Sequence, residues 1–429
     1  MNQRLWQQQS YLPERGGQGR RVVITGLGAV CAAGVGVPAL WQALLAERSG
    51  IGPITLFDPT GLPSRIAGEV RNFDPAKLID ARLKPKRLAR QAQFAVVAAA
   101  EAVDDAGFAR KELQAQRCGV VLGSALSNPQ EIAANVRQME ARGAASVRPS
   151  MLPAINIQGQ ATAVAELFEL QNSPAFCVST SCMSGISAVT TARSMILAGQ
   201  SDVMICGGTD APLDHSPATE MIAAGMCSFR NDEPERASRP FDRERDNGLL
   251  AEGAGVVILE RLDMALDRGA TIYAEILGDH SCSDQDGTPP GSGWPQTIRT
   301  ALQNALCDPS LVDYVSAWGC GDPLLDRMET QALKEVFGSR AHDLAVSSIK
   351  AVTGNPLGAA GPLQLAASAM SIRHGLLPPT ANYEHGDIDC DLDYIQGAPR
   401  RARPRRVLLN THGMGGGNTC VILGPAPRA

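Results

Sequence analysis

The sequence predicts an α/β protein built from layered sheets, and two observations support this class. Apolar, β-branched runs alternate with segments of helical periodicity along almost the whole chain, a pattern typical of layered α/β folds. The chain has 429 residues, 44% hydrophobic and 19% charged, which is ordinary for a globular protein with a large core. No short repeat or low-complexity tract interrupts this alternation.

The elements can be assigned in order from the N-terminus. Residues 1–19 are polar, Gln-rich and end in GGQG, which predicts an extension outside the core. The run RVVITGLGAV at 21–30 predicts a strand, and a helix is expected around 38–46. A helix within the Ala- and Arg-rich residues 85–107 and a strand at 117–125 follow.

The middle of the chain predicts helices at 126–170, broken at Pro149 and Pro153, and then a short strand at 174–180. A helix is expected in 181–199, whereas 209–250 is polar and irregular. The remaining expected elements are strands at 202–208, 253–260, 272–278 and 312–319, helices at 263–269, 296–305, 327–337 and 358–374, and a closing strand pair at 406–424.

Charge and cysteine usage restrict the possible partners and compartment. The formal net charge of −5 argues against nucleic acid or an anionic membrane as the main partner, and we interpret the basic run 400–406 as a solvated loop. Eleven scattered cysteines, no leader and no membrane-spanning apolar run favour a reducing cytoplasm. Neither structural-zinc spacing nor EF-hand spacing is present, so no metal is expected.

Cys182 is the nucleophile candidate because it lies where an apolar strand turns into a helix. Free N–H groups and the positive end of the helix dipole are expected to lower the pKa of its thiol. The same N–H groups can form an oxyanion hole for a thioester carbonyl. Small neighbours, including Ser181, Ser184 and Gly185, leave room for a substrate; the alternative is an inert buried cysteine.

Five stretches, in order and at suitable spacing, resemble the type II β-ketoacyl-ACP synthases over about residues 20–426. They are RVVITGLGAV, VSTSCMSGISA, SRPFDRERDNGLLAEGAGVVILE, VSSIKAVTGNPLGAAG and LLNTHGMGGGN. The resemblance implies a thiolase fold with a duplicated α-β-α-β-α five-layer architecture, divided into halves at 20–259 and 260–429. It also implies a homodimer, or a heterodimer with another ketosynthase. Acyl groups would arrive on the phosphopantetheine of an acyl carrier protein, without a cofactor of the chain's own.

The chain departs from this family where the two histidines of decarboxylative condensation are expected. Trp318 stands at the first position and Asn355 at the second, while Lys350 and Glu329 are retained. Neither replacement titrates near neutral pH, so neither can act as a general acid or base. Asn355 can still donate a hydrogen bond to a thioester oxygen. The expected cost is on the order of 10²–10³ in rate for each missing donor.

Further departures concern residues that the resemblance places beside the substrate. His412 stands where the family usually has phenylalanine, so it either replaces a lost imidazole or is a polar loop residue without a chemical role. Lys350 and Glu329 either support chemistry or persist as a buried charge pair. The residues expected to contact substrate are Cys320 and Asp322, which replace two threonines of the pantetheine tunnel, together with Thr288 and Met414.

Three functions fit these residues. The first is acyl transfer through Cys182 without decarboxylation, since a cysteine needs less activation than a serine. The second is a non-catalytic partner subunit that resembles a chain-length factor, although such subunits commonly lack the cysteine as well. The third is a β-ketoacyl-ACP synthase with a rewired site, in which Asn355 and His412 take over the donor roles.

Overall fold

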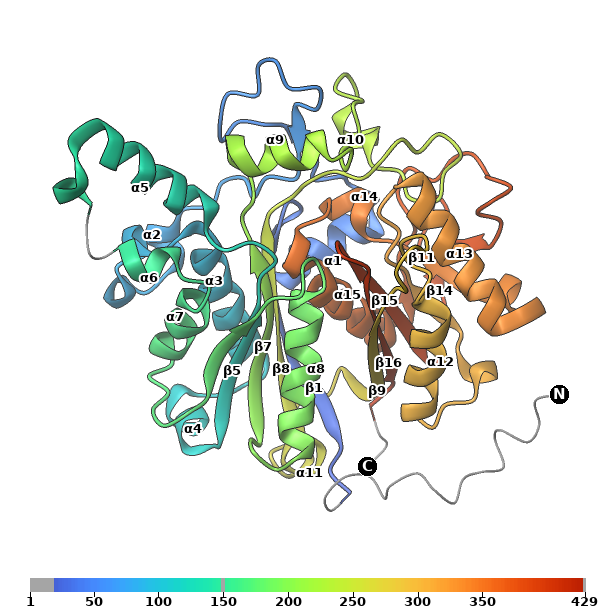
Figure 1. Cartoon of the computed structure of the whole chain (residues 1–429). Helices are drawn as coiled ribbons and strands as arrows, with labels where there is room; N and C mark the ends of the chain where they lie inside the picture. Colours follow the sequence, from blue (N-terminus) through green and yellow to red (C-terminus); the bar gives the residue numbers. More distant parts are fainter. Residues whose placement is uncertain (1–18, 148–150, 427–429) are drawn as a thin grey trace.

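The computed structural model describes residues 19–147 and 151–426. The expected extension therefore lies outside the described residues except for Gly19, and so does the expected helix break at Pro149. Within the described part, no helix is long and apolar enough to cross a membrane. Figure 1 shows the strands gathered in the centre of the molecule and the helices around and between them.

One mixed sheet path runs through the molecule and contains two sets of five strands. The first set is β1 (Val22–Cys31), β5 (Cys118–Gly123), β6 (Ala175–Val178), β7 (Val203–Asp210) and β8 (Gly253–Arg261). The second set is β9 (Ala274–Ser283), β10 (Tyr314–Ser316), β11 (Ala345–Ser347), β15 (Val407–Gly413) and β16 (Gly417–Gly424).

The two sets share one topology. In space the first follows the order β1-β8-β7-β5-β6 and the second β9-β16-β15-β10-β11, with β13 (Asp393–Tyr394) added at the far edge. In each set the first two pairings are antiparallel and the next two parallel. Strands β1 and β9 join the sets through a short antiparallel contact. This correspondence confirms the predicted duplication, although the exact boundary at residue 259 stays a prediction.

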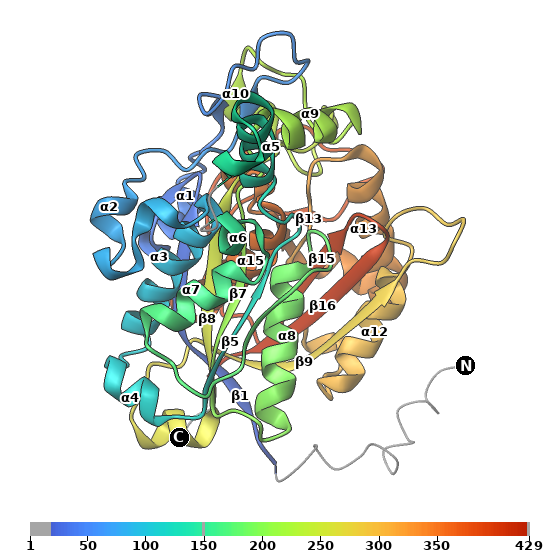
Figure 2. The ribbon, with the colours of Figure 1, turned by 60° about the vertical axis from the view of Figure 1, so that its left-hand side comes forward.

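Helices form the other three layers. Two helices lie between the two strand sets, α8 (Ser184–Leu197) and α15 (Ala360–His374), and most of α15 is buried. The outer faces are covered by α3 (Arg90–Asp105) and α7 (Gly159–Leu167) on one side and by α12 (Trp294–Asn304) and α13 (Pro323–Phe337) on the other. The view in Figure 2 shows the same arrangement, which confirms the five-layer fold.

Shorter elements complete the chain. The remaining helices are α1 (Val37–Leu45), α2 (Pro75–Leu78), α4 (Arg110–Ala115), α5 (Pro129–Arg142), α6 (Met151–Ile155), α9 (His215–Ala223), α10 (Pro234–Ala237), α11 (Leu262–Asp267) and α14 (Lys350–Thr353). The remaining strands are β2 (Gly34–Val35), β3 (Gly52–Pro53), β4 (Ile66–Ala67), β12 (Leu376–Leu377) and β14 (Arg400–Arg401). Helix α9 lies inside the segment 209–250 that was expected to be irregular, and α6 continues through the break expected at Pro153.

Glycines allow the starts of the two central helices, α8 and α15, to approach each other closely. A Cβ on Gly185, in the first turn of α8, would stand 2.1 Å from the backbone oxygen of Gly358, just before α15. A Cβ on Gly208 would meet the same oxygen at 2.2 Å. Only glycine permits this backbone approach, so the start of α8 is held against the start of α15.

Candidate active site

Cys182 lies in the turn between β6 and α8, two residues before the helix begins. Ser181 adopts a left-handed backbone conformation with φ of 57°, which is strained for a residue other than glycine. The Ser184 hydroxyl stabilises the turn by accepting from the Thr180 N–H at 2.8 Å and donating to the Ser181 carbonyl at 2.5 Å. The strand-to-helix position inferred from the sequence is therefore confirmed.

The expected lowering of the Cys182 pKa is wrong. The side chain is buried, and this burial raises the pKa of the thiol above its ordinary value. The Met414 backbone N–H and the Ser181 hydroxyl point to the sulfur and counteract burial only in part, as does the more distant charge of Lys350. Desolvation of the thiolate thus outweighs the favourable field at the start of the helix.

A cavity of about 430 Å³ opens beside Cys182. Apolar side chains from segments far apart in the sequence provide most of its wall: Met221, Met226, Leu249, Leu250, Leu325 and Leu357. The same cavity brings together seven of the residues that the sequence singled out: Cys182, Trp318, Cys320, Asp322, Asn355, His412 and Met414. Lys350 and Glu329 lie behind this wall rather than in it.

Lys350 and Glu329 hold Trp318 in place. The Lys350 Nζ atom lies 3.7 Å from the centroid of the indole ring and donates to the Trp318 carbonyl oxygen at 2.6 Å. Glu329 accepts from the backbone N–H groups of Trp318 and Gly319, each at 2.9 Å. Burial lowers the pKa of Lys350 to about 8 and raises the pKa of Glu329. The pair therefore supports the wall of the cavity by charge and cation–π contact.

Asn355 follows α14 and also lines the cavity. Its backbone N–H donates to the Leu249 carbonyl at 2.8 Å, and its carbonyl accepts from Ala251 at 3.1 Å, so the backbone is fixed. The Oδ1 atom of its side chain is buried without a hydrogen-bond partner. Such a group costs free energy unless a ligand or water satisfies it.

Cys320 and Asp322, which stand where the family resemblance predicts two threonines, have different surroundings. Cys320 is buried in the cavity wall, and burial raises the pKa of its thiol well above the ordinary value. Asp322 begins α13, where its Oδ1 atom accepts from the N–H groups of Leu324 and Leu325, each at 2.8 Å. The carboxylate is thus a helix cap as well as part of the cavity.

Thr288 is the expected substrate-facing residue that the structure does not bring to the cavity. It lies exposed in the loop after β9, and its hydroxyl bonds to the Gln285 carbonyl and the Ser292 hydroxyl, each at 2.6 Å. Pro290 is the residue of this loop that reaches the cavity. The resemblance located the loop correctly but could not give the direction of each side chain.

His412 lies at the end of β15, buried against the ring of Trp294 with 5.3 Å between the ring centroids. Its Nδ1 atom is 3.0 Å from Oδ1 of Asn418 on β16. Burial lowers the pKa of His412, so the imidazole is neutral near pH 7. Sequence reasoning singled out His412 but missed Asn418, which had no distinguishing signal beyond its place in the glycine loop.

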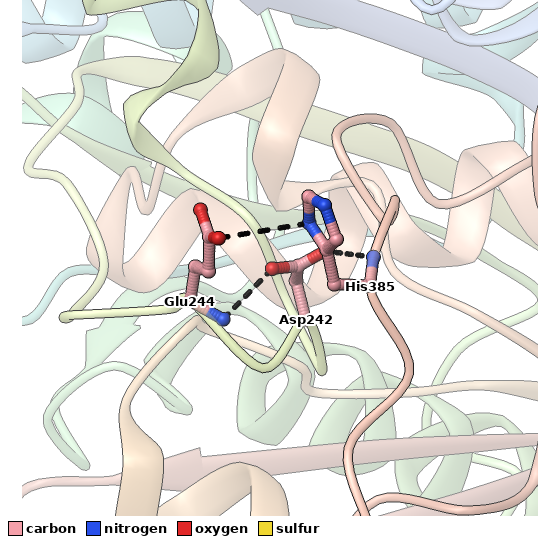
Figure 3. Close-up of side chains that lie close together, drawn as sticks. All are labelled: Asp242, Glu244 and His385. Atoms are coloured by element: carbon pink, nitrogen blue, oxygen red, sulfur yellow. Dashed lines mark hydrogen bonds and ion pairs between the residues drawn. The ribbon is translucent and has the colours of Figure 1, made fainter.

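A second group of titratable side chains, Asp242, Glu244 and His385, lies close together (Figure 3), and none of the three lines the cavity. Asp242 Oδ2 accepts from the backbone N–H groups of Glu384 and His385, each at 2.7 Å. The Arg239 guanidinium lies 3.3 Å from Asp242 and 3.6 Å from Glu244. The acidic side chains are thus already paired, and the cluster fastens two loops together.

Comparison with known proteins identifies this arrangement. The model of the N-terminal domain of β-ketoacyl synthases matches residues 19–265, and that of their C-terminal domain matches residues 273–384. The chain belongs to the β-ketoacyl synthase family. The resemblance stated from the five sequence stretches is therefore confirmed.

The relatives include a 3-oxoacyl-[acyl-carrier-protein] synthase and a subunit of a polyketide synthase. The chain is 38% identical to 3-oxoacyl-[acyl-carrier-protein] synthase 2 of Coxiella burnetii, over 94% of this chain and 98% of the relative. It is 38% identical to the tetracenomycin polyketide synthase ketoacyl synthase alpha subunit of Streptomyces glaucescens, over 94% and 97%. The solved ishigamide ketosynthase/chain length factor superposes with a TM-score of 0.87 at 33% identity, covering 95% of this chain and 100% of that chain.

Proposed function

We propose that this β-ketoacyl synthase family member takes an acyl chain from an acyl carrier protein onto Cys182 and transfers it without decarboxylative condensation. The observation that carries the proposal is the cavity itself. Cys182 lines this cavity, and so do Trp318 and Asn355, which stand at the positions where two titratable imidazoles are expected. The nucleophile is kept, and the groups for decarboxylation are replaced.

The residues that line the cavity support acyl transfer without decarboxylation. Its apolar wall suits an acyl chain, because burying methylene groups there is favourable by about 0.8 kcal/mol each. Among the described residues that line it, Asp322 is the one charged side chain, and no Lys or Arg contributes. A malonyl carboxylate would therefore meet a like charge and no cation, which disfavours it as the extender.

The names of the relatives support a proposal for the acyl donor and the pathway. The Coxiella burnetii relative is named for acyl carrier protein, and a solved relative is a ketosynthase/chain length factor pair. We propose that this chain likewise receives its acyl group from an acyl carrier protein in the cytoplasm. It would act in type II fatty-acid or polyketide assembly, as a homodimer or paired with another ketosynthase, and would need no cofactor of its own.

Intact-protein mass spectrometry after incubation with acyl carrier protein thioesters tests the proposal. We expect an acyl adduct on the wild type and none on Cys182→Ala. Cys320→Ala, which removes another thiol of the same cavity, is expected to keep the adduct. An adduct that survives in Cys182→Ala would show that another residue is the nucleophile. Rapid release of CO₂ from malonyl-acyl carrier protein would support the rewired synthase instead.

The second candidate is a chain-length-factor-like partner subunit, favoured by the bulk and fixed position of Trp318. Lys350 contacts the face of its ring and donates a hydrogen bond to its backbone carbonyl, so a fixed apolar group fills the position where an imidazole is expected. Failure of every donor to acylate Cys182, together with stable co-purification with an intact ketosynthase, is the outcome expected from this candidate. A stable homodimer that forms the adduct would exclude it.

A further inference from the structure

A chain of three side chains reaches from a surface loop to the cavity. Asn418 Nδ2 donates to Asp284 Oδ1 at 2.7 Å, and Asn418 Oδ1 lies 3.0 Å from His412 Nδ1. His412 lies in β15 and Asn418 in β16, and Asp284 directly follows β9; these three strands are neighbours in the second strand set. The sequence separates Asp284 from Asn418 by 134 positions, so only the fold brings them together.

This chain determines which nitrogen of His412 carries the proton. The Asp284 carboxylate also accepts from the backbone N–H groups of Gly291 at 2.8 Å and Gly293 at 2.7 Å, so donors surround it. The amide nitrogen of Asn418 must face this carboxylate, and its oxygen must face His412. The oxygen can only accept, so Nδ1 of the neutral imidazole is protonated. Nε2 is then the atom with a free lone pair.

His412 and the nucleophile candidate Cys182 line the same cavity. Met414, two residues after His412, presents its backbone N–H to the sulfur of Cys182. Among the described residues lining the cavity, Trp318 and Asn355 do not titrate, and Asp322 caps a helix. The carboxylates of Asp284 and Asp322 raise the pKa of His412, but burial outweighs them and lowers it. His412 is therefore the one neutral base available there.

We propose that His412 is the general base that deprotonates a hydroxyl or amine acceptor attacking the acyl-Cys182 thioester, and that Asn418 and Asp284 are its positioning residues. The inference rests on the proposed acyl-transfer function. The acceptor oxygen or nitrogen forms a bond to the carbonyl carbon while the C–S bond breaks. Its proton passes to Nε2 and then to the departing Cys182 sulfur. No electron is gained or lost, and both side chains return to their starting states.

Single-turnover deacylation separates this role from acylation. Acyl-Cys182 is formed first from an acyl carrier protein thioester, and its loss to hydroxylamine, an amine that is uncharged near neutral pH, is followed by mass spectrometry. His412→Phe should still form the adduct when the incubation is prolonged, which shows that it is folded, and deacylation is then measured from this isolated adduct. Its deacylation should be slower by on the order of 10²–10⁴-fold, the usual contribution of a general base.

The pH profile tests the positioning residues. Wild-type deacylation should fall as pH drops through a value below the ordinary histidine pKa, and His412→Phe should lose this inflection. Asp284→Asn removes a carboxylate that raises the pKa of His412, so the inflection should move to lower pH and the rate should drop, while Asp284→Glu restores both in part. Wild-type deacylation by His412→Phe would overturn the inference, whereas absence of any adduct on the wild type would overturn the proposed function itself.

Discussion

At the residue scale, the segments that carry Trp318 and Asn355, the positions where the resemblance predicts two histidines, are held by buried contacts. Lys350 and Glu329 still contact the segment that carries Trp318, now through its ring face and its backbone. Asn355 keeps both of its backbone bonds to the neighbouring strand-like segment. The buried support around both segments is therefore in place, and the family resemblance leads us to expect two titratable donors where Trp318 and Asn355 stand.

Restoring those donors should restore decarboxylation. In the double variant Trp318→His/Asn355→His, we expect CO₂ release from malonyl-acyl carrier protein at a rate at least 10²-fold above the wild type, since each donor is worth on the order of 10²–10³. Each single variant is the control and should gain less. A folded double variant that releases no CO₂ would show that the cavity excludes malonyl groups for another reason, such as the charge of Asp322.

The reactivity of Cys182 should depend steeply on pH. Its raised pKa leaves little thiolate at pH 7, so alkylation by iodoacetamide should keep accelerating as pH rises past the ordinary pKa of a cysteine thiol. Lys350→Met removes a charge that lowers this pKa and should slow alkylation at every pH below the plateau. Peptide mapping gives the rate at Cys182, with Cys227 of the same cavity as internal reference. A rate already constant from pH 7 upwards would mean that the thiol is ionised and that burial does not dominate.

At the element scale, the sequence predicted the long periodic elements and the strand-to-helix turn. It missed β11 (Ala345–Ser347), which is too short for a periodic signal, and α9, which is embedded in a polar segment. The sequence singled out Cys182 by its strand-to-helix turn, and His412 and Met414 by the glycine loop, but it missed Asn418 at the end of that loop. The contact between His412 and the Asp284–Asn418 pair was not predicted, because tertiary pairing of distant strands has no local signature. Burial of Cys182 likewise could not be estimated from its place before a helix.

The close contact between Gly185 and Gly358 should affect the acylation of Cys182 more than the stability of the fold. Gly185→Ala places a methyl group 2.1 Å from the Gly358 carbonyl and 2.7 Å from Pro362, so the start of α8 must move. We expect destabilisation of about 1–3 kcal/mol and a larger loss of Cys182 acylation, because the turn moves with the helix. Ser194→Ala, at an exposed position of the same helix, should change neither. Urea unfolding and adduct formation measure the two effects separately, and equal acylation by Gly185→Ala and the wild type would contradict this account.

At the scale of the whole molecule, buried carboxylates tie the two halves to each other. Asp210, at the end of β7, accepts from the Gly358 N–H at 2.7 Å. Asp326, in α13 of the second half, accepts in turn from the Phe241 N–H at 2.7 Å. Burial raises the pKa of Asp210 to about 6 and that of Asp326 to about 7. Both groups therefore hold a proton more tightly in the folded state than in the unfolded chain.

Because these pKa values are raised by folding, the contribution of each carboxyl to the free energy of unfolding decreases as pH rises. An exposed ion pair shows the opposite dependence. The stabilising contribution of Asp326 is fully present below its unfolded pKa of about 3.9 and is lost as pH rises through about 7. The free energy of unfolding of the wild type, minus that of Asp326→Asn, should therefore fall between about pH 4 and pH 7, with a limiting slope of about 1.4 kcal/mol per unit.

Asp263 provides the opposite control, because its ion pair with Arg261 lowers its pKa. The difference between the wild type and Asp263→Asn should instead shrink as pH falls below about 4, and by a smaller amount because the pair is exposed. Urea unfolding at a series of pH values measures both differences. If the Asp326 difference stayed constant from pH 4 to 7, this carboxyl would be ionised in the folded protein. Its nearest cation, Arg245 at 3.8 Å, would then outweigh burial.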